Sequence, residues 1–220
     1  MLIEQDFILL ILNCVKYRSK ALKQKETWLN TELPDNVLYF HVIGNPNLVS
    51  NYVFDNTEKV LYVKCDDDYN SLPKKVIKAY QAISQVYNFK YIFKTDDDQK
   101  LIEPKFFATI IKVLTSKEKE INKKVHYGGY IVDVKVPYIS KYNTIHHELP
   151  QKLIINSGKY CNGRFYLLSN EAVYSLITNE KIELISKEYL EDYAIGYYLP
   201  EEFKKTIMFI DTNVYFKDFL

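Results

Sequence analysis

Apolar runs alternate with segments of helical spacing along the first half of the chain. Four short runs rich in β-branched and aromatic residues predict buried strands, at Phe7–Val15, Val37–Ile43, Val60–Val63 and Tyr91–Phe93. Three longer segments carry apolar residues at helical spacing or a charged, helix-compatible composition, at Tyr17–Asn30, Pro73–Asn88 and Pro104–Leu114. This alternation predicts an α/β sandwich with a mostly parallel central sheet.

The second half is less regular. Its pattern predicts strands at Tyr127–Val132, Tyr160–Leu168, Thr206–Ile210 and Asn213–Phe216. It also predicts two helices, one at Asn170–Thr178 with Ser169 as its cap and one at Tyr189–Leu199. A polar, aromatic loop is expected at Val134–Pro150. Because no repeat, low-complexity segment or linker divides the chain, we expect residues 1–220 to form one domain.

Composition narrows the class of protein. Lys and Arg together number 29 and Asp and Glu 28, so there is no excess charge to attract nucleic acid, and we expect no nucleic-acid partner. The apolar run Phe7–Val15 is shorter than the about 20 residues of a membrane span and follows acidic residues, unlike a signal peptide. We therefore expect a soluble, cytoplasmic protein, or a lumenal one of the Golgi type if an N-terminal anchor has been removed.

Two acidic runs follow predicted strands. Asp96, Asp97 and Asp98 follow Tyr91–Phe93 after two intervening residues, and Asp66–Asp68 follow Val60–Val63. In open α/β sheets the carboxyl ends of the strands are where ligands bind, and clustered carboxylates repel one another unless a cation is present. Hard oxygen ligands on a tight turn suit Mn²⁺ or Mg²⁺. A solvated acidic turn is the alternative, and composition does not choose between the two runs.

Five motifs in order give the chain a family resemblance. Thr27-Trp28, DDDYNSLPKK, FKTDDD, the segment from Tyr160-Cys161-Asn162-Gly163 to Ser169, and EDYAIG resemble the successive motifs of the β1,3-glycosyltransferase family. That family includes β3-galactosyltransferases, Fringe proteins and core 1 synthases. The resemblance implies a GT-A-type α/β/α sandwich, with residues 1–116 binding the nucleotide sugar and residues 117–220 on the acceptor side.

The resemblance also implies a reaction, the inverting transfer of a sugar from a UDP-sugar to a hydroxyl of a glycan, a protein or another acceptor. A β1,3 linkage is the expected product. Asp98, with Asp96, would hold the metal ion, and Asp96 would also lie beside the ribose. The donor side would include a further set of residues, namely Asp67, Tyr69, Lys75 and Asp97, the last expected to support the turn.

The motif EDYAIG supplies the candidate base. Asp192 would take the proton of the acceptor hydroxyl, while Glu191 is expected at the helix edge. A helix-start acid that complements the helix dipole is the alternative for Asp192, and a solvated helix face is the alternative for Lys75.

The chain departs from the family pattern at two places. Arg164 and Phe165 replace glycines where the backbone is expected to approach a ligand, and no histidine follows His147 to join the metal shell. Asp211 and Asn213 are the candidate substitutes for that histidine. Two other functions therefore stay open: a sugar- or nucleotide-binding module without turnover, and another metal-dependent phosphate enzyme such as a nucleotidyltransferase.

Overall fold

An eight-stranded sheet forms the centre of the computed structural model, which describes residues 1–121 and 124–219. Its strand order is β13-β9-β12-β7-β2-β3-β5-β4. The strands are β2 (Phe7–Leu12), β3 (Val37–Gly44), β4 (Tyr52–Asp55), β5 (Val60–Val63), β7 (Tyr91–Asp96), β9 (Tyr127–Val134), β12 (Gly158–Ser169) and β13 (Met208–Phe209). Three two-stranded pairs accompany it: β1 (Ile3–Glu4) with β6 (Tyr87–Asn88), β8 (Gln99–Leu101) with β14 (Phe216–Asp218), and β10 (Tyr138–Ile139) with β11 (Ile154–Ile155).

The central strand β2 explains why the sheet is mostly parallel. All of its residues are buried, as expected for an unbroken apolar run covered on both faces. Ile8 lies opposite Leu38 of β3 and Ile92 of β7, and both pairings are parallel. The pairs β3–β5 and β9–β13 are parallel too, whereas β12 runs antiparallel to both of its neighbours and β4 is an antiparallel edge strand. The mostly parallel sheet expected from the sequence is confirmed.

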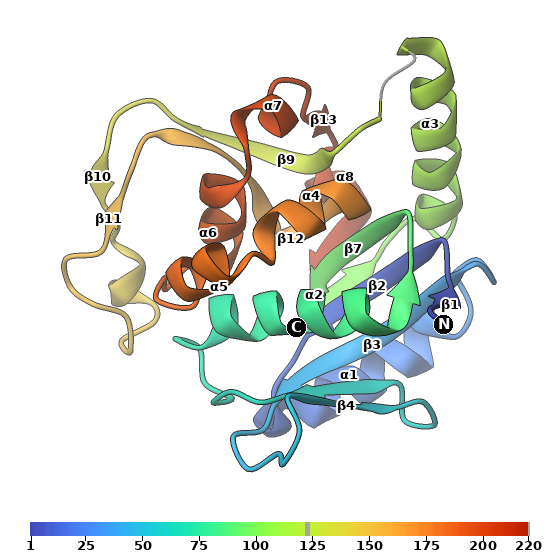
Figure 1. Cartoon of the computed structure of the whole chain (residues 1–220), viewed down its shortest axis with the longest axis horizontal. Coiled ribbons are helices and arrows are strands. Elements are labelled where there is room, and N and C mark those ends of the chain that lie inside the picture. Colours follow the sequence, from blue (N-terminus) through green and yellow to red (C-terminus); the bar gives the residue numbers. More distant parts are fainter. Residues whose placement is uncertain (122–123, 220) are drawn as a thin grey trace.

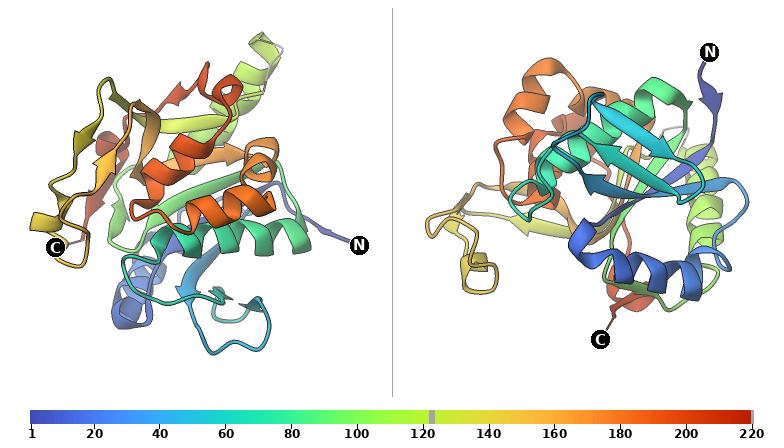
Figure 2. Two further views of the ribbon diagram at one scale, coloured as in Figure 1. Left: turned by 60° about the vertical axis from the view of Figure 1, so that its left-hand side comes forward. Right: turned by 90° about the horizontal axis from the view of Figure 1, so that it is seen from below.

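Helices cover both faces of this sheet (Figure 1). One face carries α2 (Leu72–Val86), α4 (Asn170–Leu176), α5 (Asn179–Ile185) and α6 (Glu191–Tyr198). The other carries α1 (Arg18–Gln24), the π-helical turn η2 (Lys25–Leu29) and α3 (Phe106–Ile121). The short elements are η1 (Val15–Tyr17), η3 (Tyr142–Thr144), α7 (Glu201–Lys204) and α8 (Thr212–Tyr215). Figure 2 shows the resulting three layers from two further directions.

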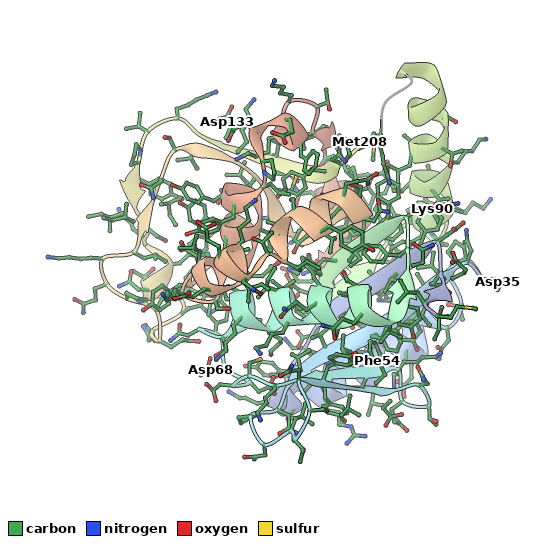
Figure 3. The ribbon with its side chains drawn as sticks, in the orientation of Figure 1. Asp35, Phe54, Asp68, Lys90, Asp133 and Met208 are labelled. Carbon is green, nitrogen blue, oxygen red and sulfur yellow. The ribbon has the colours of Figure 1, made fainter. Side chains whose placement is uncertain are left out.

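The alternation of side chains along the strands divides the core into two. Ile8 and Leu10 of β2 pack under α2, whereas Leu9 packs with Trp28 and Phe107 on the opposite face. Side chains fill the space between the helices and the sheet throughout (Figure 3). The expected α/β/α sandwich is therefore what the structure shows. No helix in the described ranges combines the length and apolarity needed to cross a bilayer.

Two local expectations were wrong, and the strand β4 and the helix α5 were not predicted. Asn213–Phe216 was expected to be a strand, but the Asp211 carboxylate accepts a hydrogen bond from the Asn213 N–H and starts α8, so the strand β14 begins only at Phe216. The edge strand β4 was missed although it contains the short β-prone run Tyr52-Val53-Phe54, and none of its side chains is fully buried. The segment expected to be one polar loop between β9 and β12 contains β10 and η3.

Candidate active site

A cavity of about 670 Å³ opens where several parallel strands end. Its wall comes from the segments after β2, β5 and β7, from the first turn of α6, and from Gly163 in β12. The volume is in the range of small-molecule sites, and this end of an open α/β sheet is the usual ligand position. Both acidic runs line it, since Asp67 and Asp68 face the same space as Asp96, Asp97 and Asp98.

The three carboxylates after β7 have different partners. Asp96 ends the strand, and its Oδ1 lies 2.8 Å from Nζ of Lys94. Asp97 Oδ1 lies 3.2 Å from Nζ of Lys20, while Asp98 Oδ1 accepts a hydrogen bond of 2.7 Å from the side-chain amide of Gln99. Mutual repulsion within the run is thus offset by two lysines and an amide donor.

Buried backbone contacts fix the position of this turn. The fully buried Gln24 donates from its amide nitrogen to the carbonyl oxygens of Asp96 and Gln99, each at 3.0 Å. The backbone N–H of Asp97 donates to the carbonyl of Leu12 at the end of β2, at 3.1 Å. These contacts hold the turn before any ligand arrives.

Burial changes the acidity of two of these groups. It raises the pKa of Asp96 to about 6, although Lys94 opposes the change. It raises the pKa of Asp97 to about 6 as well, against the opposing charge of Lys20. The two carboxylates are therefore partly protonated near pH 6 when no cation is bound.

The first acidic run braces the strand ends. Asp67 Oδ1 accepts from Nζ of Lys75 at 2.7 Å and from the backbone N–H of Gly44 at 2.8 Å, and Oδ2 accepts from the N–H of Val15 at 2.7 Å. Lys75 is 1% exposed and also donates to the Asn13 carbonyl. Asp67 and Lys75 thereby connect β2, β3 and α2, and their role in donor binding stays a prediction.

Two residues near the start of α2 complete this side of the cavity. Asp68 accepts a hydrogen bond of 2.8 Å from the Ser71 N–H at Oδ1, just before the helix begins (Figure 3). Tyr69 lines the cavity and stacks on the ring of His146, with 4.0 Å between ring centroids. These two rings form an aromatic wall of the cavity, to which the segment between β9 and β12 contributes His146.

The first turn of α6 brings Asp192 into the same cavity. Its Oδ2 accepts from the Gly163 N–H at 2.9 Å and its Oδ1 accepts from the N–H of Tyr193 at 2.7 Å. Burial raises the pKa of Asp192, against the opposing charge of Lys94. A Cβ on Gly163 would lie 3.5 Å from Oδ2 of both Asp192 and Asp96, so both carboxylates lie close to this glycine.

Sequence reasoning missed Lys94 and misplaced Glu191. Lys94 is 1% exposed, and its Nζ lies 2.8 Å from Glu191 Oε2 and from the Gly163 carbonyl as well as from Asp96. The other carboxylate oxygen of Glu191 accepts a hydrogen bond from the Tyr166 hydroxyl. Glu191 was expected at the helix edge but is buried as the partner of Lys94. A lysine between the buried residues Phe93 and Thr95 was the available signal, because a buried charge needs a partner.

A model of the galactosyltransferase family matches residues 20–204, which is most of the chain. The chain belongs to the galactosyltransferase family. The resemblance drawn from the five motifs is thereby confirmed, and the protein is a glycosyltransferase. No curated protein sequence matches it closely enough to count as a relative.

Two solved structures are similar to this family member in fold. Mouse xyloside xylosyltransferase 1, in its apo form, is 11% identical, with a TM-score of 0.42 over 95% of this chain and 86% of the other. The galactosyltransferase LgtC, in complex with donor and acceptor sugar analogues, is 7% identical, with a TM-score of 0.45 over 93% of this chain and 73% of the other.

The galactosyltransferase segment YCNGRF does not present its bulky residues to the cavity. Gly163 lines the cavity, whereas Phe165 is fully buried in the core and stacks on Phe216. Arg164 donates to Asp218 at 2.9 Å and to Asn213 at 3.2 Å. The expectation that Arg164 and Phe165 approach a ligand was therefore wrong, because the residue that lies in the cavity wall is still glycine.

Two carboxylates are available for a divalent cation. Within residues 1–121 and 124–219, no group of three or more His, Cys, Asp or Glu is arranged to hold a metal ion. Asp96 and Asp98 nevertheless both face the cavity and offer hard oxygen ligands. The two candidate substitutes for the missing histidine have other partners. Asp211 caps α8, Asn213 accepts a hydrogen bond from Arg164, and neither residue lines the cavity. The donor set fits Mn²⁺ or Mg²⁺ only where substrate oxygens or water supply the remaining ligands.

Proposed function

We propose that this galactosyltransferase-family protein transfers a sugar from a UDP-sugar to an acceptor hydroxyl, with inversion, with the help of Mn²⁺ or Mg²⁺, and with formation of a β1,3 linkage. One observation carries the proposal. The carboxylates of the turn after β7 and the carboxylate of Asp192 meet in one cavity, which Gly163 also lines. Such a site offers a donor side and a proton acceptor within a single small-molecule cavity.

The donor side is suited to a nucleoside diphosphate. Lys16 and Lys20 line the cavity and supply positive charge for phosphate oxygens. Asp98 and Asp96 would hold the cation, which when bound neutralises charge on the departing diphosphate. Asp96 would also accept hydrogen bonds from ribose hydroxyls. Asp97, which is 11% exposed and paired with Lys20, supports the turn instead of binding the donor.

Asp192 is the proposed general base. Two backbone N–H groups orient its carboxylate, and its raised pKa makes it a better proton acceptor than an ordinary aspartate. An inverting transfer needs one such base, because the acceptor hydroxyl attacks directly as the diphosphate leaves. The stacked rings of Tyr69 and His146 offer an apolar surface for the acceptor on the same side of the cavity.

A panel of UDP-sugars tests this function. The protein is incubated with each donor, with Mn²⁺, Mg²⁺ or a chelator, and UDP release and the melting temperature are measured. We expect one UDP-sugar to stabilise the protein only with metal and to be hydrolysed slowly or transferred. Metal-dependent stabilisation without any UDP release indicates a binding module, and consumption of nucleoside triphosphates indicates a nucleotidyltransferase.

Two variants assign the metal-binding turn. Asp98→Asn should abolish joint binding of Mn²⁺ and UDP, because Asp98 would hold the cation that offsets the charge of the diphosphate. Asp66→Asn is the control, since Asp66 is exposed, belongs to the other acidic run and does not line the cavity. Calorimetry should give parent-like UDP affinity for the control. Undiminished affinity in Asp98→Asn would refute the assignment of this turn.

A further inference from the structure

A projecting arm joins β9 to β12. We define the arm as residues 135–157, which include β10, η3 and β11. In Figure 1 it extends to the left of the sheet, and the first view of Figure 2 shows the same ribbon at the edge of the molecule. Asp133, labelled in Figure 3, lies on β9 where the arm begins. The arm is therefore accessible to a binding partner on this side of the protein.

One part of the arm is anchored in the protein. Ile155 is 1% exposed and Leu149 is 4% exposed, and both pack with Tyr160, Leu190 and Tyr193. The strands β10 and β11 pair antiparallel, with Tyr138 opposite this buried Ile155 and Ile139 opposite Ile154. Neighbouring residues of a strand point to opposite faces, so the pair Ile139–Ile154 lies on the face away from the anchor.

The outer part of the arm leaves large apolar side chains uncovered. Ile139 and Ile154 are each 57% exposed although they lie opposite one another. Val136 and Ile145 are each 72% exposed, and Tyr142 is 45% exposed. Single exposed apolar residues are ordinary, but several within one short segment mark an interaction surface.

The charge of the arm differs from that of the chain as a whole. Lys135, Lys141, Lys152 and Lys159 lie on or directly beside it, and all four are exposed. The acids on or directly beside it are Glu148 and Asp133, and Asp133 pairs with Lys135 and Lys159. The whole chain is almost balanced, with 29 basic and 28 acidic side chains. Among the residues that the structure describes, Lys141 and Lys152 form no ion pair. Their charges are therefore available to an anionic partner.

We propose that the arm docks this protein onto an anionic lipid surface. Exposed aliphatic and tyrosine side chains beside unpaired lysines are the combination that binds the interface of an anionic bilayer, where apolar groups enter the boundary layer and lysines meet the headgroups. A second copy of the arm is the less suitable occupant, because two such surfaces would bring like charges together. His146 belongs to the arm and lines the cavity, so the docking surface adjoins the site.

Sedimentation with vesicles tests the proposal without any need for catalysis. The full chain is mixed with vesicles of phosphatidylcholine alone or with a third of phosphatidylserine, at low and high salt. We expect binding to the anionic vesicles, weakened at high salt because screening reduces the attraction of the lysines. Absence of binding to the anionic vesicles would overturn the proposal, and so would equal binding to both vesicle types.

Paired variants locate the surface. Ile139→Ser/Ile154→Ser and Lys141→Glu/Lys152→Glu should each weaken vesicle binding about tenfold or more. The control Val49→Ser/Val53→Ser removes apolar side chains that are 102% and 43% exposed elsewhere, and it should bind within about twofold of the parent. Unchanged melting temperatures show that the variants fold. Arm variants that bind like the parent would overturn the assignment.

A fluorescence measurement distinguishes membrane insertion from self-association. The single tryptophan of the chain, Trp28, is 2% exposed and gives a constant background. In Ile139→Trp the added emission should shift to the blue with anionic vesicles and be quenched by brominated lipids, whereas in Val49→Trp it should not. An emission shift that depends on protein concentration without vesicles, together with a dimer in solution, would make a second copy the occupant and contradict the proposal.

Discussion

Lys94 and Glu191 form an ion pair of 2.8 Å inside the protein, between β7 and the first turn of α6. The Lys94 side chain is 1% exposed and the Glu191 side chain 6% exposed. Because Asp96 and the Gly163 carbonyl share the same ammonium group, the pair also connects the donor-side turn to the segment that holds Asp192. A buried cation with three oxygen partners fixes the relative positions of these elements.

Removal of this cation should destabilise the protein strongly. Lys94→Met leaves Glu191 buried without its partner, and breaking a buried ion pair in this way costs about 3–5 kcal/mol. Urea unfolding measures the loss. The control is Lys187→Met, which breaks a pair with Glu183 whose side chains are 68% and 71% exposed, and should change stability little. Equal losses in the two variants would show that the burial of the Lys94 pair is energetically unimportant.

Two glycines of the family motifs should respond differently to alanine. A Cβ on Gly196 would lie 2.3 Å from Cβ and 2.6 Å from Cα of Tyr160, so α6 and β12 would have to separate. We expect Gly196→Ala to lose about 3 kcal/mol or more by overpacking. A Cβ on Gly163 would lie 3.2 Å from Nζ of Lys94, a milder contact than that at Gly196, so the fold should tolerate Gly163→Ala better than Gly196→Ala.

The cost of Gly163→Ala should appear in function instead. The added methyl group would lie 3.5 Å from Oδ2 of both Asp96 and Asp192, so we expect weaker donor binding or slower transfer with a smaller loss of melting temperature than in Gly196→Ala. Denaturant unfolding and UDP titration of both glycine variants check these expectations. A stable Gly196→Ala, or a fully active Gly163→Ala, would contradict the packing described here.

Loss of the proton from Asp97 should make the apo protein less stable as the pH rises. The pKa of Asp97 is about 6 in the folded protein because of burial, and close to 4 in an unfolded chain. Between these values the folded form holds a proton that the unfolded form has lost, so increasing pH removes stability. Relative to Asp97→Asn, the parent should lose about 1–3 kcal/mol from pH 4 to pH 7.

Unfolding of both proteins in urea across this pH range provides the measurement. The lowered pKa of His41, about 3 because of burial, acts in the opposite direction, but it is present in both proteins and cancels in the difference. A parent that gains stability relative to Asp97→Asn over this range would show that Lys20 outweighs burial at Asp97.

Much of this architecture follows from local patterns in the sequence. The unbroken apolar run of β2 predicts a buried parallel strand. The acidic run that ends β7 predicts carboxylates at the carboxyl end of the sheet. The convergence of the runs around Asp67 and Asp96 has the same cause, since the carboxyl ends of parallel strands meet at one edge.

Other features of the site depend on long-range packing. Lys94 and Glu191 are far apart in the chain, and nothing local distinguishes Glu191 from the adjacent Asp192 at the start of α6. In β12 the register shifts between Cys161 and Tyr166, so the simple alternation of strand side chains fails at Phe165. Gly163 lies within this irregularity and is the mark that a bulge leaves in a strand pattern, but the size of the register shift depends on the neighbouring strands.

Single-turnover transfer by Asp192→Asn is the most direct test of the proposed chemistry. Asparagine keeps the shape but cannot accept a proton, and its single amide oxygen can accept from only one of the N–H groups of Gly163 and Tyr193. Parent and variant are saturated with the UDP-sugar and metal found in the donor panel and mixed with acceptor, with donor affinity measured by calorimetry. We expect equal donor affinity and a transfer rate lower by about 10²-fold or more, because the base acts only in the transition state. Transfer at the parent rate would contradict the account and leave Asp192 as a helix-start acid.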